Sequence, residues 1–341
     1  MKHILILLLC WTFTLSLTAQ QVARNHSARP KVGLVLGGGG AKGAAEVGVL
    51  YAIERSGVPI DYIAGTSIGS IVGALYSMGY RAKDIDNMFR SQQWLDLLTD
   101  RATDLKATPI RKRNGVTYFF GFPISRKSNK QGAISHTGLL RGDQIVCLLD
   151  SMIALQDSAV AHNDSLDFST LPIPFRCVAV DVRQMKEVEL THGNLAMALR
   201  ASMAIPGAFK PVEKDSAVLI DGGVLNNLPV DVVRQMGADV VIAVDLTQNK
   251  RATRNSKMNQ HGTALGKMLR WMKVRPDLEK YNRNRQDCDV YINPNLKNYD
   301  ATDFQSDKID EMISLGIDAG NDALPALKKL RKRVMKHSKR K

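Results

Sequence analysis

The segment Gly65-Thr66-Ser67-Ile68-Gly69 contains a serine whose surroundings suit a nucleophile. It follows the apolar run 61–64 and precedes the helix-like run 70–75. A strand, a tight turn and a helix in this order form a nucleophile elbow. Glycines suit such a turn because they lack a Cβ that would clash with the neighbouring backbone. The helix N-terminus favours negative charge near Ser67. The alternative interpretation is a glycine- and serine-rich helix start with a capping serine.

A run of four glycines, Gly37 to Gly40, follows the strand-like segment 31–36. Its open N–H groups at Gly38, Gly39 and Gly40 can bind an anion or an oxyanion. The spacing of Gly38, Gly40 and Gly43 also matches the dinucleotide fingerprint of an oxidoreductase. That fingerprint requires an acidic residue about 20 residues on, at the end of the second strand. Here the second strand ends in the serine turn, so we interpret the loop as an oxyanion hole facing Ser67.

A third segment, Asp221-Gly222-Gly223, follows the apolar run 217–220. Alone it is typical of a turn that closes a strand. Beside a nucleophilic serine and a glycine loop, Asp221 becomes the candidate base, because the two glycines let its turn lie against another backbone. A Ser-Asp-His triad in chain order is the competing scheme. It would have to use His261, in a polar run, or His337, in a basic tail.

These three segments, in this order, resemble the three signatures of the patatin-like phospholipase family. The segment 201–209 with Pro211 is similar to the family's segment ahead of the Asp-Gly motif, and the resemblance covers roughly residues 32–246. One departure is Glu46, where bacterial members often have a histidine. The position is outside the catalytic pair, so the departure bears on subfamily rather than chemistry. The motif glycines are Gly43, Gly65, Gly69, Gly222 and Gly223.

The resemblance implies a Ser-Asp dyad without a cofactor. Ser67 would attack an ester carbonyl, Asp221 would take its proton, and Gly38 to Gly40 would hold the oxyanion of a phospholipid or lysophospholipid substrate. A lone aspartate, with a pKa of about 3.9, is a poor base for a hydroxyl. The dyad therefore requires a desolvated site and oxyanion donors, each worth ~3–4 kcal/mol. The alternative is a non-catalytic lipid-binding protein of the same fold, which would need neither Ser67 nor Asp221.

Apolar runs alternate with helix-patterned segments along the chain, which predicts one α/β domain with a mostly parallel central sheet covered by helices on both faces. Residues 81–135 are where a cap over the acyl pocket would be inserted. A polar linker or loop over 247–262 leads into 263–327, an extension of the same domain with a final helix around 309–316, interrupted at Pro325. The expected strands are 32–36, 62–64, 175–182, 217–220, 239–246 and 289–293, and the expected helices are 41–56, 68–78, 139–153, 195–203 and 230–236.

The two ends of the chain carry signals of location. Residues 1–20 read as a signal peptide, which predicts export and a periplasmic or membrane-associated protein. The net charge is +14, and nine of the residues in the basic tail, 328–341, are Lys or Arg. A basic tail predicts attraction to anionic lipid head groups. Without interleaved aromatics it does not indicate nucleic-acid binding. Widely spaced cysteines, with Cys177 in a strand-like run, and scattered histidines do not indicate a metal site.

Overall fold

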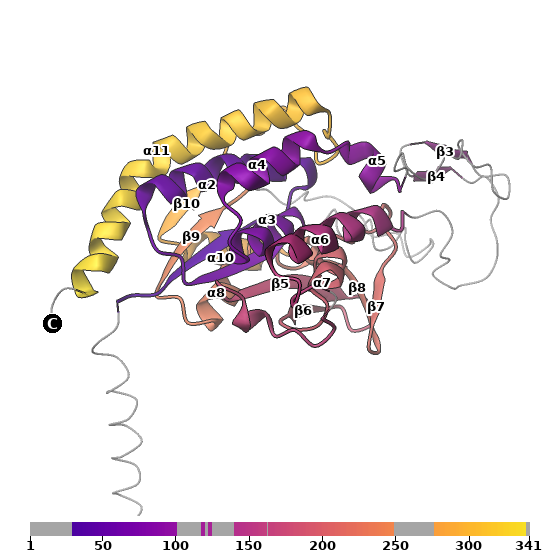
Figure 1. Ribbon diagram of the computed structural model, residues 1–341, viewed down its shortest axis with the longest axis horizontal. Helices are drawn as coiled ribbons and strands as arrows, with labels where there is room; N and C mark the ends of the chain where they lie inside the picture. Colours follow the sequence, from indigo (N-terminus) through magenta and orange to yellow (C-terminus); the bar gives the residue numbers. More distant parts are fainter. Residues whose placement is uncertain are drawn as a thin grey trace, which may run out of the picture.

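The computed structural model describes residues 29–100, 117–119, 122–124, 140–161, 163–248 and 276–338. Its central sheet lies between helices on both faces (Figure 1). The strand order is β10-β9-β1-β2-β5-β8-β7, with β6 also paired to β5. The parallel strands are β1 (Val32–Leu36), β2 (Tyr62–Thr66), β5 (Phe175–Asp181), β9 (Val240–Val244) and β10 (Val290–Ile292); the antiparallel ones are β6 (Lys186–Leu190), β7 (Val212–Lys214) and β8 (Ala217–Asp221). The predicted α/β fold with a mostly parallel sheet is confirmed.

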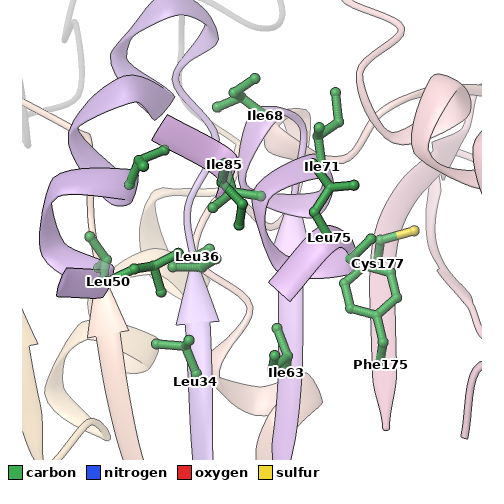
Figure 2. Close-up of a cluster of buried hydrophobic side chains, with 14 of the residues drawn as sticks. Leu34, Leu36, Leu50, Ile63, Ile68, Ile71, Leu75, Ile85, Phe175 and Cys177 are labelled. Carbon is green, nitrogen blue, oxygen red and sulfur yellow. The ribbon is translucent and has the colours of Figure 1, made fainter. Parts of the chain in front are cut away.

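Both faces of the parallel strands are buried, because helices cover both sides of the sheet. Successive side chains of a strand point to opposite faces and so enter two different cores. Leu34 and Leu36 of β1 face a core that Figure 2 shows between the sheet and the helices α2, α3 and α4. Val35 faces a second core formed with α8 and α10. The helices of the first face are α2 (Ala44–Ser56), α3 (Ile68–Ser77), α4 (Ala82–Ser91) and α11 (Ser306–Ser338), and those of the second are α8 (Val230–Gln235) and α10 (Leu278–Gln286).

The first part of the predicted cap range, 81–135, belongs to the body of the domain. Ile85 and Phe89 of α4 are buried against the first core. Of the rest of that range, the described part is α5 and the antiparallel pair β3 and β4. The signal-peptide range 1–20, the cap residues between these elements and residues 249–262 lie outside the described residues. The remaining elements are α5 (Trp94–Leu98), β3 (Thr117–Phe119), β4 (Phe122–Ile124), α6 (Asp143–Gln156), α7 (Leu195–Ser202) and the short helices η1 (Gly40–Gly43), η2 (Phe168–Thr170) and η3 (Gly222–Val224).

The predicted break of the last helix at Pro325 was wrong, because α11 runs from Ser306 to Ser338 (Figure 1). A proline inside a helix removes one hydrogen bond and crowds the preceding turn. Here an apolar stripe is buried on both sides of the proline, at Ile313 before it and at Leu330 and Val334 after it. Packing therefore outweighs the local penalty, and residues 328–338 of the predicted basic tail are helical. None of the helices in the described ranges is long and apolar enough to cross a membrane.

We predict that Gly316→Ala destabilises the protein although alanine is the better helix former. A Cβ at Gly316 of α11 would overlap the carbonyl oxygen of Ala45 in α2, and backbone cannot move aside as a side chain can. Overpacking of this kind costs typically 1–3 kcal/mol, so we expect a loss of about 2 kcal/mol in urea unfolding. Ser314→Ala, on the exposed side of the same helix, is the control and should stay within about 0.5 kcal/mol. Equal stability of the two variants would contradict the tight packing of α11 on α2.

Candidate active site

Ser67 occupies the turn between β2 and α3 in a strained conformation. Its φ is 54° and its ψ is −126°, a region that residues other than glycine rarely adopt. Two neighbouring glycines make the turn possible. A Cβ at Gly65 would overlap the carbonyl oxygen of Gly69, and one at Gly69 would overlap that of Leu36. The predicted strand–turn–helix arrangement around Ser67 is present, with the serine 4% exposed.

The register of β5 brings Asp221 to Ser67. The first part of β5, from Phe175 to Val178, pairs with β2. The second part, from Ala179 to Asp181, pairs with β8. Since β6 pairs with both parts, β2 and β8 must share the other edge of β5. They approach from opposite directions, because β2 is parallel and β8 antiparallel to β5. The end of β2 at Thr66 therefore meets the end of β8 at Asp221.

The Ser67 hydroxyl donates a hydrogen bond of 2.6 Å to Oδ2 of Asp221. The second carboxylate oxygen accepts the N–H of Gly223 at 2.7 Å. Burial raises the pKa of Asp221 to about 6, and the two hydrogen bonds oppose that rise. A carboxylate with this pKa is a stronger base than an exposed aspartate and is still ionised at neutral pH. The pair can therefore hold, release and take back one proton.

The glycine loop lies beside the nucleophile, since a Cβ at Gly38 would be 3.2 Å from Cβ of Ser67. The N–H of Gly38 donates to the carbonyl of Asn227 at 3.1 Å, and the Asn227 side-chain amide donates back to the carbonyl of Gly38 at 3.1 Å. Within the described residues, the N–H groups of Gly39 and Gly40 donate no hydrogen bond. Gly40 has φ +59°, which glycine adopts without strain. Among the described residues, the N–H groups of Gly39 and Gly40 are thus unoccupied, whereas the N–H of Gly38 is bonded to Asn227.

Sequence reasoning assigned no role to two polar residues that shape the site. Ser202, at the end of α7, accepts the N–H of Ser67 at 3.0 Å and donates to the carbonyl of Val178 at 2.7 Å. Asn227 clamps Gly38 from both sides. The available signals were weak: a serine at the end of a mostly apolar helix, and an asparagine a few residues beyond the Asp-Gly-Gly segment. Neither pattern predicts which residue the serine or the asparagine bonds to.

The other predicted motif glycines also mark close approaches. A Cβ at Gly43 would overlap the side chain of Ile68, and one at Gly222 would overlap the carbonyl of Val178. Among the described residues no histidine is hydrogen-bonded to Ser67 or to Asp221. His261 lies outside them, and only the backbone of His337 is described, near the end of α11. Nor do the described ranges hold a cluster of three or more His, Cys, Asp or Glu that could bind a metal. Cys177 is buried on β5, as predicted.

Comparison with known proteins identifies relatives over most of the chain. The rat (Rattus norvegicus) patatin-like phospholipase domain-containing protein 7 is 29% identical over 315 residues, which is 85% of this chain and 20% of the rat protein. An uncharacterized NTE family protein of Mycobacterium tuberculosis is 31% identical over 245 residues, 72% of this chain and 57% of its own length. This chain therefore spans about a fifth of the rat relative.

The crystal structure of VipD from Legionella pneumophila matches with a TM-score of 0.51 and 15% identity, covering 89% of this chain and 68% of VipD. At that identity the match shows a shared fold and no more. The family model described as patatin-like phospholipase matches residues 34–234. That range contains the serine turn, the glycine loop from Gly37 onward and the Asp-Gly-Gly segment. The chain belongs to the patatin-like phospholipase family.

Proposed function

We propose that this protein is a serine acyl-ester hydrolase that acts on phospholipids or lysophospholipids through a Ser67–Asp221 dyad. The observation that carries the proposal is the 2.6 Å hydrogen bond from the hydroxyl of Ser67 to a buried carboxylate. A buried serine that serves only as a helix cap needs neither a strained φ nor a carboxylate partner. The lipid substrate class is inferred from the family.

Each half of the reaction moves one proton twice through Asp221. As Oγ of Ser67 attacks the acyl carbonyl, Asp221 accepts the hydroxyl proton and the carbonyl oxygen becomes an oxyanion. Collapse of this intermediate expels the alcohol, which takes the proton from Asp221, and leaves an acyl group on Ser67. A water molecule then gives its proton to Asp221 and attacks the acyl-enzyme. Release of the fatty acid returns the proton to Ser67.

The oxyanion is held in this proposal by the N–H groups of Gly39 and Gly40, which have no other acceptor among the described residues. Gly38 has a different task, because its N–H and its carbonyl are both bound by Asn227. That clamp fixes the loop next to Ser67. Donors that are fixed before the reaction stabilise developing charge without a cost of reorganisation. The N-terminus of α3 adds a favourable dipole on the same side of the turn.

We predict that Ser67→Ala and Asp221→Asn each lower kcat for a soluble short-chain ester by about three orders of magnitude or more. Both changes are nearly isosteric, so circular dichroism and thermal unfolding should stay close to the parent protein. A fluorophosphonate probe should label the parent and leave Ser67→Ala unlabelled. Labelling that does not depend on Ser67 would contradict the dyad. Absence of labelling in the parent protein would favour the lipid-binding alternative.

The pH profile tests the base. Because Asp221 must be ionised to accept the proton, kcat/KM should fall below the pKa of Asp221 and level off above it. Burial raises that pKa to about 6, so the midpoint should lie near pH 6. The measurement is the initial rate at low substrate between pH 4 and 8, with stability checked at each pH. A midpoint near pH 4 would mean a solvated carboxylate, and one that moves with His261→Ala would restore the triad scheme.

Substitution in the glycine loop should act on the transition state. In Gly39→Val the new Cβ would lie 2.7 Å from Cδ1 of Leu246, so the loop must shift. Removing one oxyanion donor costs about 100-fold to 1,000-fold in kcat, and we expect a loss of that size with KM much less changed. The control combines Gly39→Ala with Leu246→Ala, which removes the 2.7 Å contact but leaves Cβ of residue 246 at 2.9 Å, so it should recover only part of kcat. A higher KM at unchanged kcat would mean that the loop only binds substrate.

We also propose that the protein is exported through residues 1–20 and contacts an anionic membrane surface through the basic end of α11. Lys329, Lys332 and Lys336 are exposed on its last turns. Gly316 of α11 packs on Ala45 at the start of α2, whereas Arg331 lies beside Gly57 at its end. The basic end is therefore about one α2 length, ~20 Å, from the start of α2, which directly follows the glycine loop. Such a contact would tether the protein without bringing Ser67 to the membrane.

We predict that the triple change Lys329→Gln, Lys332→Gln and Lys336→Gln weakens binding to anionic vesicles at low salt by about tenfold or more, at ~1 kcal/mol per engaged charge. Substitution is preferable to truncation after Leu327, because truncation would also remove Leu330 and Val334 from the core. The difference should vanish in 1 M salt, where the Debye length falls to ~3 Å. Soluble-ester hydrolysis should be unaffected.

The matched control for the membrane test removes three exposed lysines elsewhere: Lys83→Gln, Lys186→Gln and Lys297→Gln. Both triple variants lose the same net charge, so a general effect of charge would weaken vesicle binding equally. Equal loss in the two variants would contradict a contact that is specific to α11. If neither variant lost binding, the basic end would be only a solvated helix end.

A further inference from the structure

Glu46, in the first turn of α2, is a buried acid. Its side chain is fully buried, and among the described residues neither carboxyl oxygen has a hydrogen-bond partner. An ionised carboxylate in such a place is very costly, because nothing replaces its hydration. Burial raises the pKa of Glu46 well above its ordinary value, and the negative charge of Asp245 acts in the same direction. The side chain is therefore a neutral carboxylic acid at neutral pH.

The groups around Glu46 connect it to the glycine loop. The N–H of Gly37, the first residue of that loop, lies near the Glu46 carboxyl and lowers its pKa, although the bond with hydrogen-bond geometry runs from this N–H to Val244. The N–H of Gly37 donates to the carbonyl of Val244 at 3.1 Å, and Asp245 is the next residue. The Asp245 carboxylate accepts the hydroxyls of Tyr281 and Tyr291, each at 2.5 Å, and the N–H of Thr247 at 2.9 Å. Of the two acids, Asp245 is thus the one whose carboxylate oxygens are hydrogen-bonded.

Among the described residues, the close contacts that α3 and α11 make near this turn of α2 are aliphatic or backbone. From α3 the contact is Ile68, against Gly43. From α11 the contacts are Ile313, against Gly48, and Gly316, against Ala45. The charged contacts between α2 and α4 lie further along α2, where Tyr51 donates to Asp86 and Glu54 pairs with Arg81. The field at Glu46 therefore comes mainly from Asp245.

We propose that Glu46 is a positioning residue that, as a neutral carboxylic acid, packs behind Gly37 and fixes the glycine loop opposite Ser67. The inference rests on the proposed function, since the loop is its oxyanion hole. The neutral form supports the loop without adding charge. The ionised form would place a negative charge behind the loop and oppose the oxyanion. Loss of the proton from Glu46 would therefore lower kcat.

The first test compares Glu46→Gln with Glu46→Met in the soluble-ester assay. Glutamine is neutral and similar in shape, so it should keep kcat within about threefold at pH 7 and remove the fall in kcat that the parent shows at alkaline pH. Methionine fills the space without polar atoms, so it should lower kcat about tenfold at nearly unchanged KM. Thermal unfolding shows whether each variant is folded. Parent-like kcat in Glu46→Met, or the same alkaline fall in Glu46→Gln, would overturn the positioning role.

The second test does not use activity. In the native protein Glu46 keeps its proton above the pKa of ~4.3 at which the unfolded chain loses it. Between these two pKa values the native state binds one more proton, so rising pH destabilises the parent relative to Glu46→Gln. The ratio of their unfolding constants should grow by up to tenfold per pH unit from pH 5 upward. A ratio independent of pH would overturn the neutral acid, whereas the absence of Ser67-dependent hydrolysis would instead overturn the proposed function.

Discussion

Two strands end against each other along one edge of β5, and the candidate dyad exists only because they do. β2 pairs with β5 as far as Val178, and β8 pairs from Ala179 onward in the opposite direction. Ser67 and Asp221 are 154 residues apart in sequence and 2.6 Å apart at their side-chain oxygens. A slip of one residue in either ladder would turn the strand-end side chains to the opposite face of the sheet. β6, along the other edge of β5, helps to hold that register.

The same region requires backbones to approach more closely than a Cβ allows. Gly65 meets the carbonyl of Gly69 in the serine turn, and Gly222 meets the carbonyl of Val178 beside Asp221. A larger residue at either place would push the turn away from β5 and lengthen the hydrogen bond of the dyad. Gly316 has the same task further away, where it lets α11 lie against the first turn of α2. Close backbone contact thus extends from the dyad to the outer helix layer.

Three buried acids near the glycine loop differ in how many donors they accept, and this difference sets their chemistry. Asp245 accepts three hydrogen bonds, from Thr247, Tyr281 and Tyr291. Asp221 accepts two, from Ser67 and Gly223, so burial raises its pKa to about 6, near the range in which a base is useful. Glu46 accepts none among the described residues, and burial raises its pKa well above its ordinary value. The fold therefore places the same functional group in three different hydrogen-bonding environments.

The sequence by itself determined the local features, because these depend on residue type and spacing within a few positions. The alternation of apolar and helical segments, the turn at Ser67, the open loop at Gly39 and the strand end at Asp221 all follow from such patterns. Asp221 became the candidate base once the serine turn and the glycine loop were recognised, and the resemblance then implied the dyad, but no local pattern spans the separation between Ser67 and Asp221. Only the tertiary structure decided that Asn227 bonds the N–H and the carbonyl of Gly38, and that Ser202 accepts the N–H of Ser67. It also decided that α11 continues through Pro325 and that Glu46 has no hydrogen-bond partner among the described residues. Each depends on contacts between segments far apart in the chain, and packing, not local preference, selects those contacts.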